Sequence, residues 1–474
     1  MESTKKSALG SFGAFLNRGT TPYILTFALT LLSTVLVYSS PRSIPAFLLF
    51  AISAALVYFL KLKKGYQLGM AVLIAVVIVP ILGARNIFYL EVIFQIAVFA
   101  ALALGLNIVV GFSGLLNFGY MAFYAVGAYL WGFFGSQQAF LLHEIPGTAP
   151  QGTPFLLAPD WFYLFIFLGV IVASIVGLIL GLPVLRVRGD YLAIITLAFG
   201  EIVRQLANNF DKPLNLTNGP QGITPIQRPT LPRGLMTWFN SVVQPIVGHS
   251  ITDDQFYNIM FYLIALLIVI TVVIVTSRLD DSKIGRAWAA VREDELAATA
   301  MGIPANKLKL GAFAVGASFA GAMGVLFAAS RTFVSPDTFT FLQSVSVLTM
   351  VILGGIGSIQ GVIIGAAVVV ILNIQLLPSL SLFLANLRQS DAVIPIINFP
   401  WKNLSNQLDP SKYQRLIFGI ILIVMMIYRP AGIIPASRKK RELKGAVGAD
   451  PSTGGRGQGA FSEDAKADEG ADRG

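Results

Sequence analysis

The sequence predicts an all-α, polytopic integral membrane protein, a bundle of about twelve transmembrane helices that break at clusters of glycine. Three observations support this fold class: 55% of the 474 residues are hydrophobic, only 12% are charged, and the mean hydropathy is +0.73. A soluble globular chain has about 25% charged residues, so the composition argues against a water-soluble enzyme. The chain has no cysteine, which excludes disulfides, cysteine-bound metal and thiol nucleophiles.

Twelve apolar segments approach the length of roughly 20 residues that a helix needs to cross the hydrocarbon core of a bilayer. They cover residues 23–39, 43–60, 68–84, 87–110, 115–135, 161–182, 191–207, 256–276, 310–330, 341–357, 362–377 and 416–427. The segment 191–207 fits least well because Glu201 and Arg204 lie inside it. Glycines interrupt the apolar pattern at 111–114 and 354–357, so we expect broken helices there, which either line a pathway or pack tightly.

The positions of lysine and arginine predict the orientation, because cytoplasmic loops retain an excess of both residues. Most of the 34 fall inside when both termini are cytoplasmic. In a soluble chain, the net charge of +10 would suggest a nucleic-acid partner. In this hydrophobic chain we expect contact with a lipid bilayer and no nucleic-acid partner. Two long polar loops, 208–255 and 378–414, then lie outside, either as a docking surface or as tethers between helices.

Polar side chains surround the first glycine cluster, and they form the candidate pathway: Asn107, Ser113, Asn117, Tyr120 and Tyr124. Amide, hydroxyl and phenol groups beside an apolar wall suit a small amphiphilic solute, although an aromatic belt at the membrane interface would also explain the tyrosines. Glu201 and Arg204 are three residues apart and can pair on one helix face, either as a structural ion pair inside the bundle or as a gate.

A second pair of polar residues, Glu91 and Gln95, also shares one helix face. Glu91 lies near the membrane edge, and we expect it to be exposed at the interface.

The inside loop 278–309 has a pattern unlike that of the others. Ile284, Trp288 and Val291 recur at helical spacing, a second short helix follows from Asp294, and Gly302 is a plausible helix stop. With Arg292, Glu293 and Glu295 at its head, this amphipathic unit is suited to a socket on a partner protein. The alternative is a helix that rests on the bilayer surface.

The chain has no nucleotide-binding signature of its own. The dipeptide Gly-Lys is absent, so the phosphate-binding P-loop motif cannot be present. The two histidines, His143 and His249, have no matching ligand cluster, and we expect no metal, no cofactor and no catalytic residue. Any ATP chemistry must therefore belong to another chain.

Six stretches together resemble one family, the LivM-type permease subunits of ABC importers for branched-chain amino acids. They are GLNIVVGFSGLLNFGYMAFYAVGAY (105–129), RVRGDYLAIITLAFGEIVR (186–204), LTNGPQGI (216–223), KIGRAWAAVREDELAATAMGI (283–303), SPDTFTFLQSVSVLTMVILGGIGSIQGVIIGA (335–366) and YRPAGIIP (428–435). The resemblance covers about 105–435, and the order of the stretches along the chain is specific.

The resemblance implies that the 278–309 loop is the coupling loop that fits into an ATPase subunit. The residues assigned to coupling are Arg286, Arg292, Glu293, Glu295, Ala297, Ala298 and Gly302. Importers of other classes have a glutamate directly before the paired alanines, whereas this chain has Leu296 there and Glu295 one position earlier.

The resemblance also implies a complex and a location. The partners are a second permease subunit of the LivH type, two ATP-binding cassette subunits and an extracytoplasmic solute-binding protein, and the location is the bacterial inner membrane. Expected regions are an N-terminal extension (1–86) with about three transmembrane helices, a permease domain (87–435) and a disordered cytoplasmic tail (436–474). Leucine, isoleucine and valine are the expected solutes. Alternative solutes are urea, short amides and other amino acids. The alternative class of protein is an ion-coupled secondary transporter.

Overall fold

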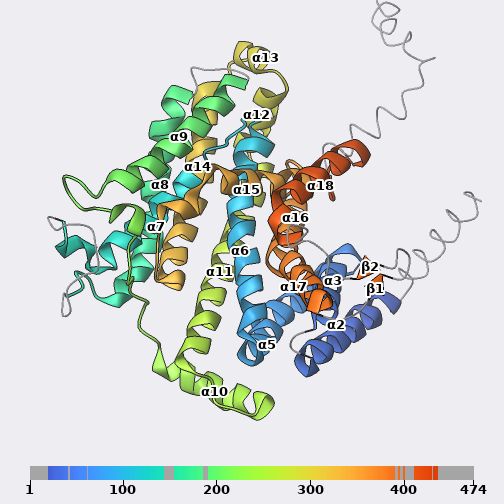
Figure 1. The fold of residues 1–474 in the computed structure, drawn as a ribbon. Coiled ribbons are helices and arrows are strands. Elements are labelled where there is room, and N and C mark those ends of the chain that lie inside the picture. Colours follow the sequence, from blue (N-terminus) through green and yellow to red (C-terminus); the bar gives the residue numbers. More distant parts are fainter. Residues whose placement is uncertain are drawn as a thin grey trace, which may run out of the picture.

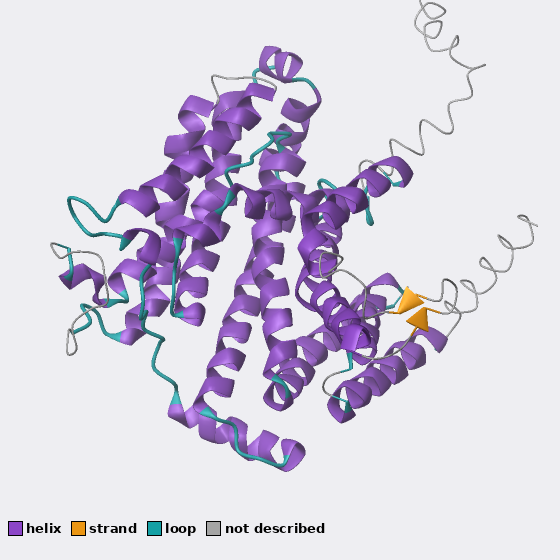
Figure 2. Cartoon of the chain, viewed as in Figure 1, coloured by secondary structure: helices purple, strands orange, loops and turns teal. Residues whose placement is uncertain are grey.

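Long apolar helices account for most of the chain in the computed structural model (Figure 1). The structure describes residues 20–40, 43–60, 62–142, 154–184, 190–389, 393–394, 399–400, 410–429 and 431–435. Within these ranges, two short strands, β1 (Val393–Ile394) and β2 (Phe399–Pro400), pair antiparallel, and helices dominate elsewhere (Figure 2). The predicted disordered tail and His143 lie outside the described residues.

The N-terminal helices form a group with a hydrophobic cluster of its own. This group comprises α2 (Thr21–Ser39), α3 (Ile44–Phe59), and a continuous helix made of α4 (Lys64–Val72), a π-helical turn (Leu73–Ile78) and α5 (Val79–Arg85). Its cluster also includes side chains of α10 (Arg233–Val247) and of the first turns of α11 (Asp253–Asp281). Between α2 and α3, the buried hydroxyls of Ser33 and Ser53 lie 3.1 Å apart, the kind of polar contact that joins helices in lipid.

The main core surrounds α14 (Ala305–Arg331). It packs against α6 (Ile87–Asn107), α7 (Met121–Phe134) and α8 (Phe162–Val184), while α11 packs along α6. The backbones touch where glycines meet: a Cβ atom on Gly127 of α7 would lie 2.0 Å from the carbonyl oxygen of Gly321 in α14. Because lipid supplies no hydrophobic drive between helices, such close approach provides the packing contacts instead.

The C-terminal part begins with α15 (Phe341–Gly354) and α16 (Ile359–Ile371). A π-helical turn (Leu372–Leu376) joins α16 to α17 (Leu377–Gln389), and α18 (Gln414–Tyr428) follows later in the chain. The remaining short turns are η3 (Gln137–Phe140), η4 (Pro159–Trp161), η5 (Gly219–Gln221), η6 (Pro336–Phe339) and η10 (Pro410–Tyr413).

Two short helices cap one end of the bundle, α12 (Lys283–Glu293) and α13 (Glu295–Ala300), while α10 lies at the opposite end (Figure 1). We call the pair α12 and α13 the hairpin, and we name the two ends of the bundle the hairpin end and the α10 end.

Each of the twelve predicted segments contains a helix, but their number as crossings stays a prediction. Seven helices in the described residues are long and apolar enough to cross a membrane, by length and composition: Thr21–Ser39, Lys64–Arg85, Ile87–Phe112, Pro159–Pro183, Asp253–Asp281, Ala305–Arg331 and Ile359–Gln389. Four shorter apolar helices correspond to α3, α7, α15 and α18. The doubtful segment is α9 (Asp190–Asn209), which is a helix but does not reach the same hydropathy because of its charged residues.

The two predicted loops contain helical residues. The loop 378–414 begins inside α17, and the loop 208–255 contains α10. The predicted segment 362–377 ended before Pro378, whereas the helix continues to Gln389. An internal proline removes a backbone hydrogen bond and clashes with the preceding turn. The wider π-helical turn Leu372–Leu376 lies just before Pro378 and allows the helix to continue, and Pro80 follows the π-helical turn Leu73–Ile78 in the same way.

Candidate functional site

The two glycine breaks meet each other near the hairpin end. Helix α6 ends in a π-helical turn (Ile108–Phe112), and α15 ends at Gly354 before two glycines with positive φ, Gly355 and Gly357. The backbone N–H of Gly357 donates to Asn107 Oδ1 at 2.8 Å. A Cβ on Gly111 would lie 2.7 Å from that same nitrogen, so only glycine permits the contact. Both helices are broken as predicted, and the breaks pack tightly on each other.

Four of the predicted pathway residues are buried around this junction and bind the chain's own backbone. Ser113 Oγ donates to the carbonyl of Val109 at 2.6 Å, and the Tyr120 hydroxyl donates to that of Gly316 at 2.8 Å. Asn117 Oδ1 accepts from Gly119 N at 2.9 Å. The Nδ2 groups of Asn107 and Asn117 are buried and have no hydrogen-bond partner in the described part of the chain. These residues hold the broken segment in shape.

Tyr124, the fifth predicted residue, lines a cavity of about 340 Å³ that we call the central cavity. Its wall comes from α6, α7, η6, α14, α15 and the chain around the π-helical turn Leu372–Leu376. Its polar lining residues are Gln95, Tyr124, Thr338, Gln343, Ser346 and Asn373. Asn373 Oδ1 is buried and has no hydrogen-bond partner among the residues that the structure describes. Sequence reasoning missed the contribution of α15, although Gln343 and Ser346, three residues apart in an apolar segment, were a signal for it.

Glu201 and Arg204 form the predicted ion pair, and Arg204 also lies 3.6 Å from Asp337. The expectation that the pair lies inside the bundle was wrong. The side chains of Glu201 and Arg204 are 40% and 21% exposed, because α9 lies at the edge of the bundle beside η6.

The hairpin is built as its sequence predicts. Ser282 Oγ accepts from the first backbone N–H groups of α12, and Asp294 Oδ1 does the same for α13. Gly302, with a φ of +84°, follows the end of α13. Trp288 is buried, stacks near Phe112 with ring centroids 6.4 Å apart, and donates from Nε1 to the carbonyl of Leu308. These contacts fix the hairpin to α6 and α14.

One hairpin residue reaches the broken end of α6 directly. Arg292 Nη1 donates to the carbonyl oxygen of Gly111 at 2.5 Å. The side chain of Glu295 also turns inward, where Oε2 pairs with Lys309 Nζ at 2.7 Å, and Ala298 is buried within the hairpin. Arg286 Nη1 binds the carbonyl of Asp281 at 3.0 Å.

The exposed surface of the hairpin includes two apolar side chains that sequence reasoning did not select. Leu296 is 70% exposed and Met301 is 84% exposed, at the tip where α13 projects from the bundle (Figure 1). Glu293, Ala297 and Gly302 from the predicted set are exposed near them. Apolar side chains exposed at a charged helix tip are typical of a surface that a partner covers.

The fold and this site define a class, the polytopic helical membrane permeases. Residues 88–426 match the family described as "Branched-chain amino acid transport system / permease component", and the chain belongs to this family. It is 36% identical over 384 residues to the high-affinity branched-chain amino acid transport system permease protein LivM of Salmonella typhimurium, covering 79% of this chain and 76% of that protein.

Two further relatives have related names. LivM of Escherichia coli K12 is 37% identical over 356 residues, 73% of this chain and 70% of that protein. The permease protein LivH of the same strain is 24% identical over 336 residues, 71% of this chain and 91% of that protein. No solved structure matches the chain. Its family and its apolar helices make this chain a multi-pass membrane protein.

Proposed function

We propose that this chain is the permease subunit of an ABC importer that carries leucine, isoleucine and valine into the cell, with ATP hydrolysed by separate subunits. The relatives named above are permeases of branched-chain amino acid transport. The observation that carries the mechanism is the hydrogen bond from Arg292 to Gly111, which joins an exposed hairpin to a broken membrane helix.

The hairpin end faces the cytoplasm in this proposal, since the hairpin lies in the loop 278–309, which the distribution of lysine and arginine predicts to be cytoplasmic. Leu296 and Met301 insert into a groove of an ATPase subunit, and Glu293 and Ala297 border them. Leu296 occupies the position where other importer classes have glutamate, so the contact here is apolar. Arg286, Glu295, Ala298 and Gly302 set the shape of the hairpin that presents them.

Closure of the ATPase subunits moves the hairpin as one body, because its caps and the Trp288 contacts hold it rigid. Arg292 transmits this movement to the end of α6, and the Asn107 contact transmits it to the break between α15 and α16. Helices α6 and α15 both line the central cavity. One movement at the hairpin therefore shifts two walls of that cavity and changes which side of the membrane it opens to.

The central cavity is the substrate pathway in this proposal. Tyr124 and the amide side chains offer hydrogen bonds, while Phe99 and Phe327 offer apolar surface for an aliphatic side chain. Asn107, Ser113, Asn117 and Tyr120 hold the broken wall beside it. The Glu201 and Arg204 pair on α9 serves as a gate at the edge of the bundle.

The proposed complex has further subunits around this chain. The chain pairs with a second permease of the LivH type and two ATP-binding cassette subunits, and a solute-binding protein docks on the loops of the α10 end. Residues 87–435 form the permease domain, and 1–86 form an extension whose helices pack against α10 and α11.

The test is uptake of radiolabelled leucine into proteoliposomes that contain this chain with its partner permease, ATPase subunits and binding protein. We expect uptake to require ATP, the ATPase subunits and the binding protein together. Uptake that persists when the ATPase subunits are left out and a proton or sodium gradient is imposed would refute the proposal.

A further inference from the structure

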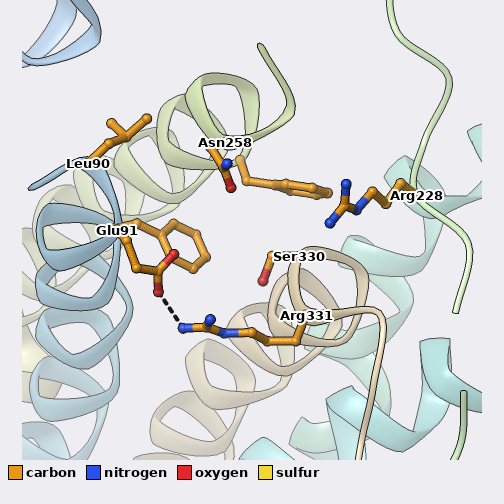
Figure 3. Close-up of a pocket in the computed structure, with 8 residues that line it drawn as sticks. Leu90, Glu91, Arg228, Asn258, Ser330 and Arg331 are labelled. Carbon is orange, nitrogen blue, oxygen red and sulfur yellow. Dashed lines mark hydrogen bonds and ion pairs between the residues drawn. The ribbon is translucent and has the colours of Figure 1, made fainter. Parts of the chain in front are cut away.

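A second, strongly polar pocket lies at the α10 end. We call it the outer pocket; it has a volume of about 230 Å³ between α6, α11, α14 and the chain that precedes α10. Five polar side chains line it, Glu91, Arg228, Asn258, Ser330 and Arg331, and Figure 3 shows them converging from these separate segments. Two arginines and one glutamate line this small volume, and the side chains of Arg228, Arg331 and Glu91 are 32%, 40% and 31% exposed.

The internal pairing of these groups is incomplete. Glu91 accepts hydrogen bonds from both Arg331 and Gln95, so it is not the simply exposed residue that its place near the membrane edge suggested. Arg228 pairs with Asp254 at 3.0 Å on the outer side and lies over the ring of Tyr257. The Nε–H group of Arg228 is buried and has no hydrogen-bond partner in the described residues. The pocket lining therefore contains one closed ion pair and a second arginine, Arg228, whose partner Asp254 lies outside the lining.

This set of groups matches the head of an α-amino acid, which carries a carboxylate and an ammonium on one carbon. Guanidinium groups bind carboxylates through paired, charge-assisted hydrogen bonds. Arg228 and Arg331 provide two such groups, and Glu91 provides the counter-charge for the ammonium. A zwitterion can replace the Glu91 and Arg331 pair without leaving either charge unpaired. An uncharged solute such as urea has no charges to offer in exchange.

The outer pocket also adjoins the central cavity. Gln95, which donates to Glu91 at 3.0 Å, lines the central cavity one helical turn further along α6. On α14, Ser330 and Arg331 line the outer pocket, and Phe327, one turn earlier, lines the central cavity. The Arg331, Glu91 and Gln95 network thus separates the two spaces, and a solute that opens this ion pair loosens the barrier between them.

We propose that the outer pocket binds the zwitterionic head of an α-amino acid, with its carboxylate on Arg228 and Arg331 and its ammonium on Glu91, in exchange for the internal ion pair. This inference rests on the proposed function, because it makes the outer pocket the first site on the route to the central cavity. It also selects among the solutes that the sequence left open, since it requires a free carboxylate and a free ammonium.

Site-specific labelling of the complete complex, without the binding protein, tests the inference. The chain has no cysteine of its own, so Ser330→Cys places one thiol of this chain in the outer pocket. We expect leucine to slow its reaction with a small cationic thiol reagent, about fivefold at four times the dissociation constant. Leucinamide, which lacks the carboxylate, and 4-methylpentanoate, which lacks the ammonium, leave the rate unchanged. Arg233→Cys, exposed at the start of α10, is the control, and its labelling does not respond to leucine.

A double change separates recognition from structural support. Glu91→Gln with Arg331→Gln keeps two hydrogen-bonding side chains at the barrier but removes both charges, and leucine then no longer protects Ser330→Cys. Equal protection by leucine and leucinamide, or protection that survives the double change, would overturn the inference. If the complex carries out ATP-dependent leucine uptake and leucine still fails to protect, only the inference fails. If leucine protects but no uptake is found, only the proposed function fails.

Discussion

The hydrogen bond between Arg292 and Gly111 leads to the sharpest prediction. Arg292→Ala removes the hydrogen bond that Nη1 donates to the carbonyl oxygen of Gly111 at 2.5 Å, at the broken end of α6, and it also removes the side chain that packs on Gly114. A hydrogen bond with a charged donor contributes about 1.5–3 kcal/mol. If the free energy of this hydrogen bond couples the hairpin to the pathway, its loss lowers the number of leucine molecules transported per ATP by about 10-fold to 150-fold.

The assay measures leucine uptake and ATP hydrolysis in the same proteoliposomes. We expect Arg292→Ala to keep hydrolysis and assembly while the ratio of leucine to ATP falls, because the ATPase subunits still bind the tip of the hairpin. Lys283→Ala is the matched control, since Lys283 is an exposed cation of the same helix and is not among the residues assigned to coupling. A ratio in Arg292→Ala equal to that of the wild type or of Lys283→Ala would refute the coupling route.

Three further predictions concern packing, docking and the pathway. Gly321→Ala places a Cβ 2.2 Å from a carbonyl oxygen of α8, and this overpacking costs about 1–3 kcal/mol or more, so we expect a lower melting temperature in detergent. In the control, Gly311→Ala on the same helix, the new Cβ meets nothing within 4 Å, and the melting temperature stays unchanged. Leu296→Asp with Met301→Asp abolishes co-purification of the ATPase subunit, and retained co-purification would contradict docking at this tip. Asn373→Leu keeps the melting temperature, since Oδ1 has no hydrogen-bond partner within the described part of the chain, but it lowers leucine uptake. Unchanged uptake would remove this residue from the pathway.

The sequence by itself determined the helices and their local features. A backbone in lipid must satisfy its own hydrogen bonds, so long apolar segments become helices, and each of the twelve predicted segments contains a helix in the structure. The Asp294 cap, the turn at Gly302 and the Glu201 and Arg204 pair were also predictable, because each depends on residues within a few positions of one another. The predicted segment 362–377 ended too early, because the π-helical turn Leu372–Leu376 changes the local geometry before Pro378 and the helix continues.

Tertiary structure alone decided which distant residues meet. Asn107 contacts Gly357, which is 250 positions away in the sequence. Arg292 contacts Gly111, 181 positions away, and Arg331 contacts Glu91, 240 positions away. Helical periodicity relates residues only three or four positions apart, so it cannot tell that Arg292 binds Gly111 while Leu296 and Met301 stay exposed at the tip. The central cavity and the outer pocket likewise exist only because α6, α14 and their neighbours are packed together at glycine contacts.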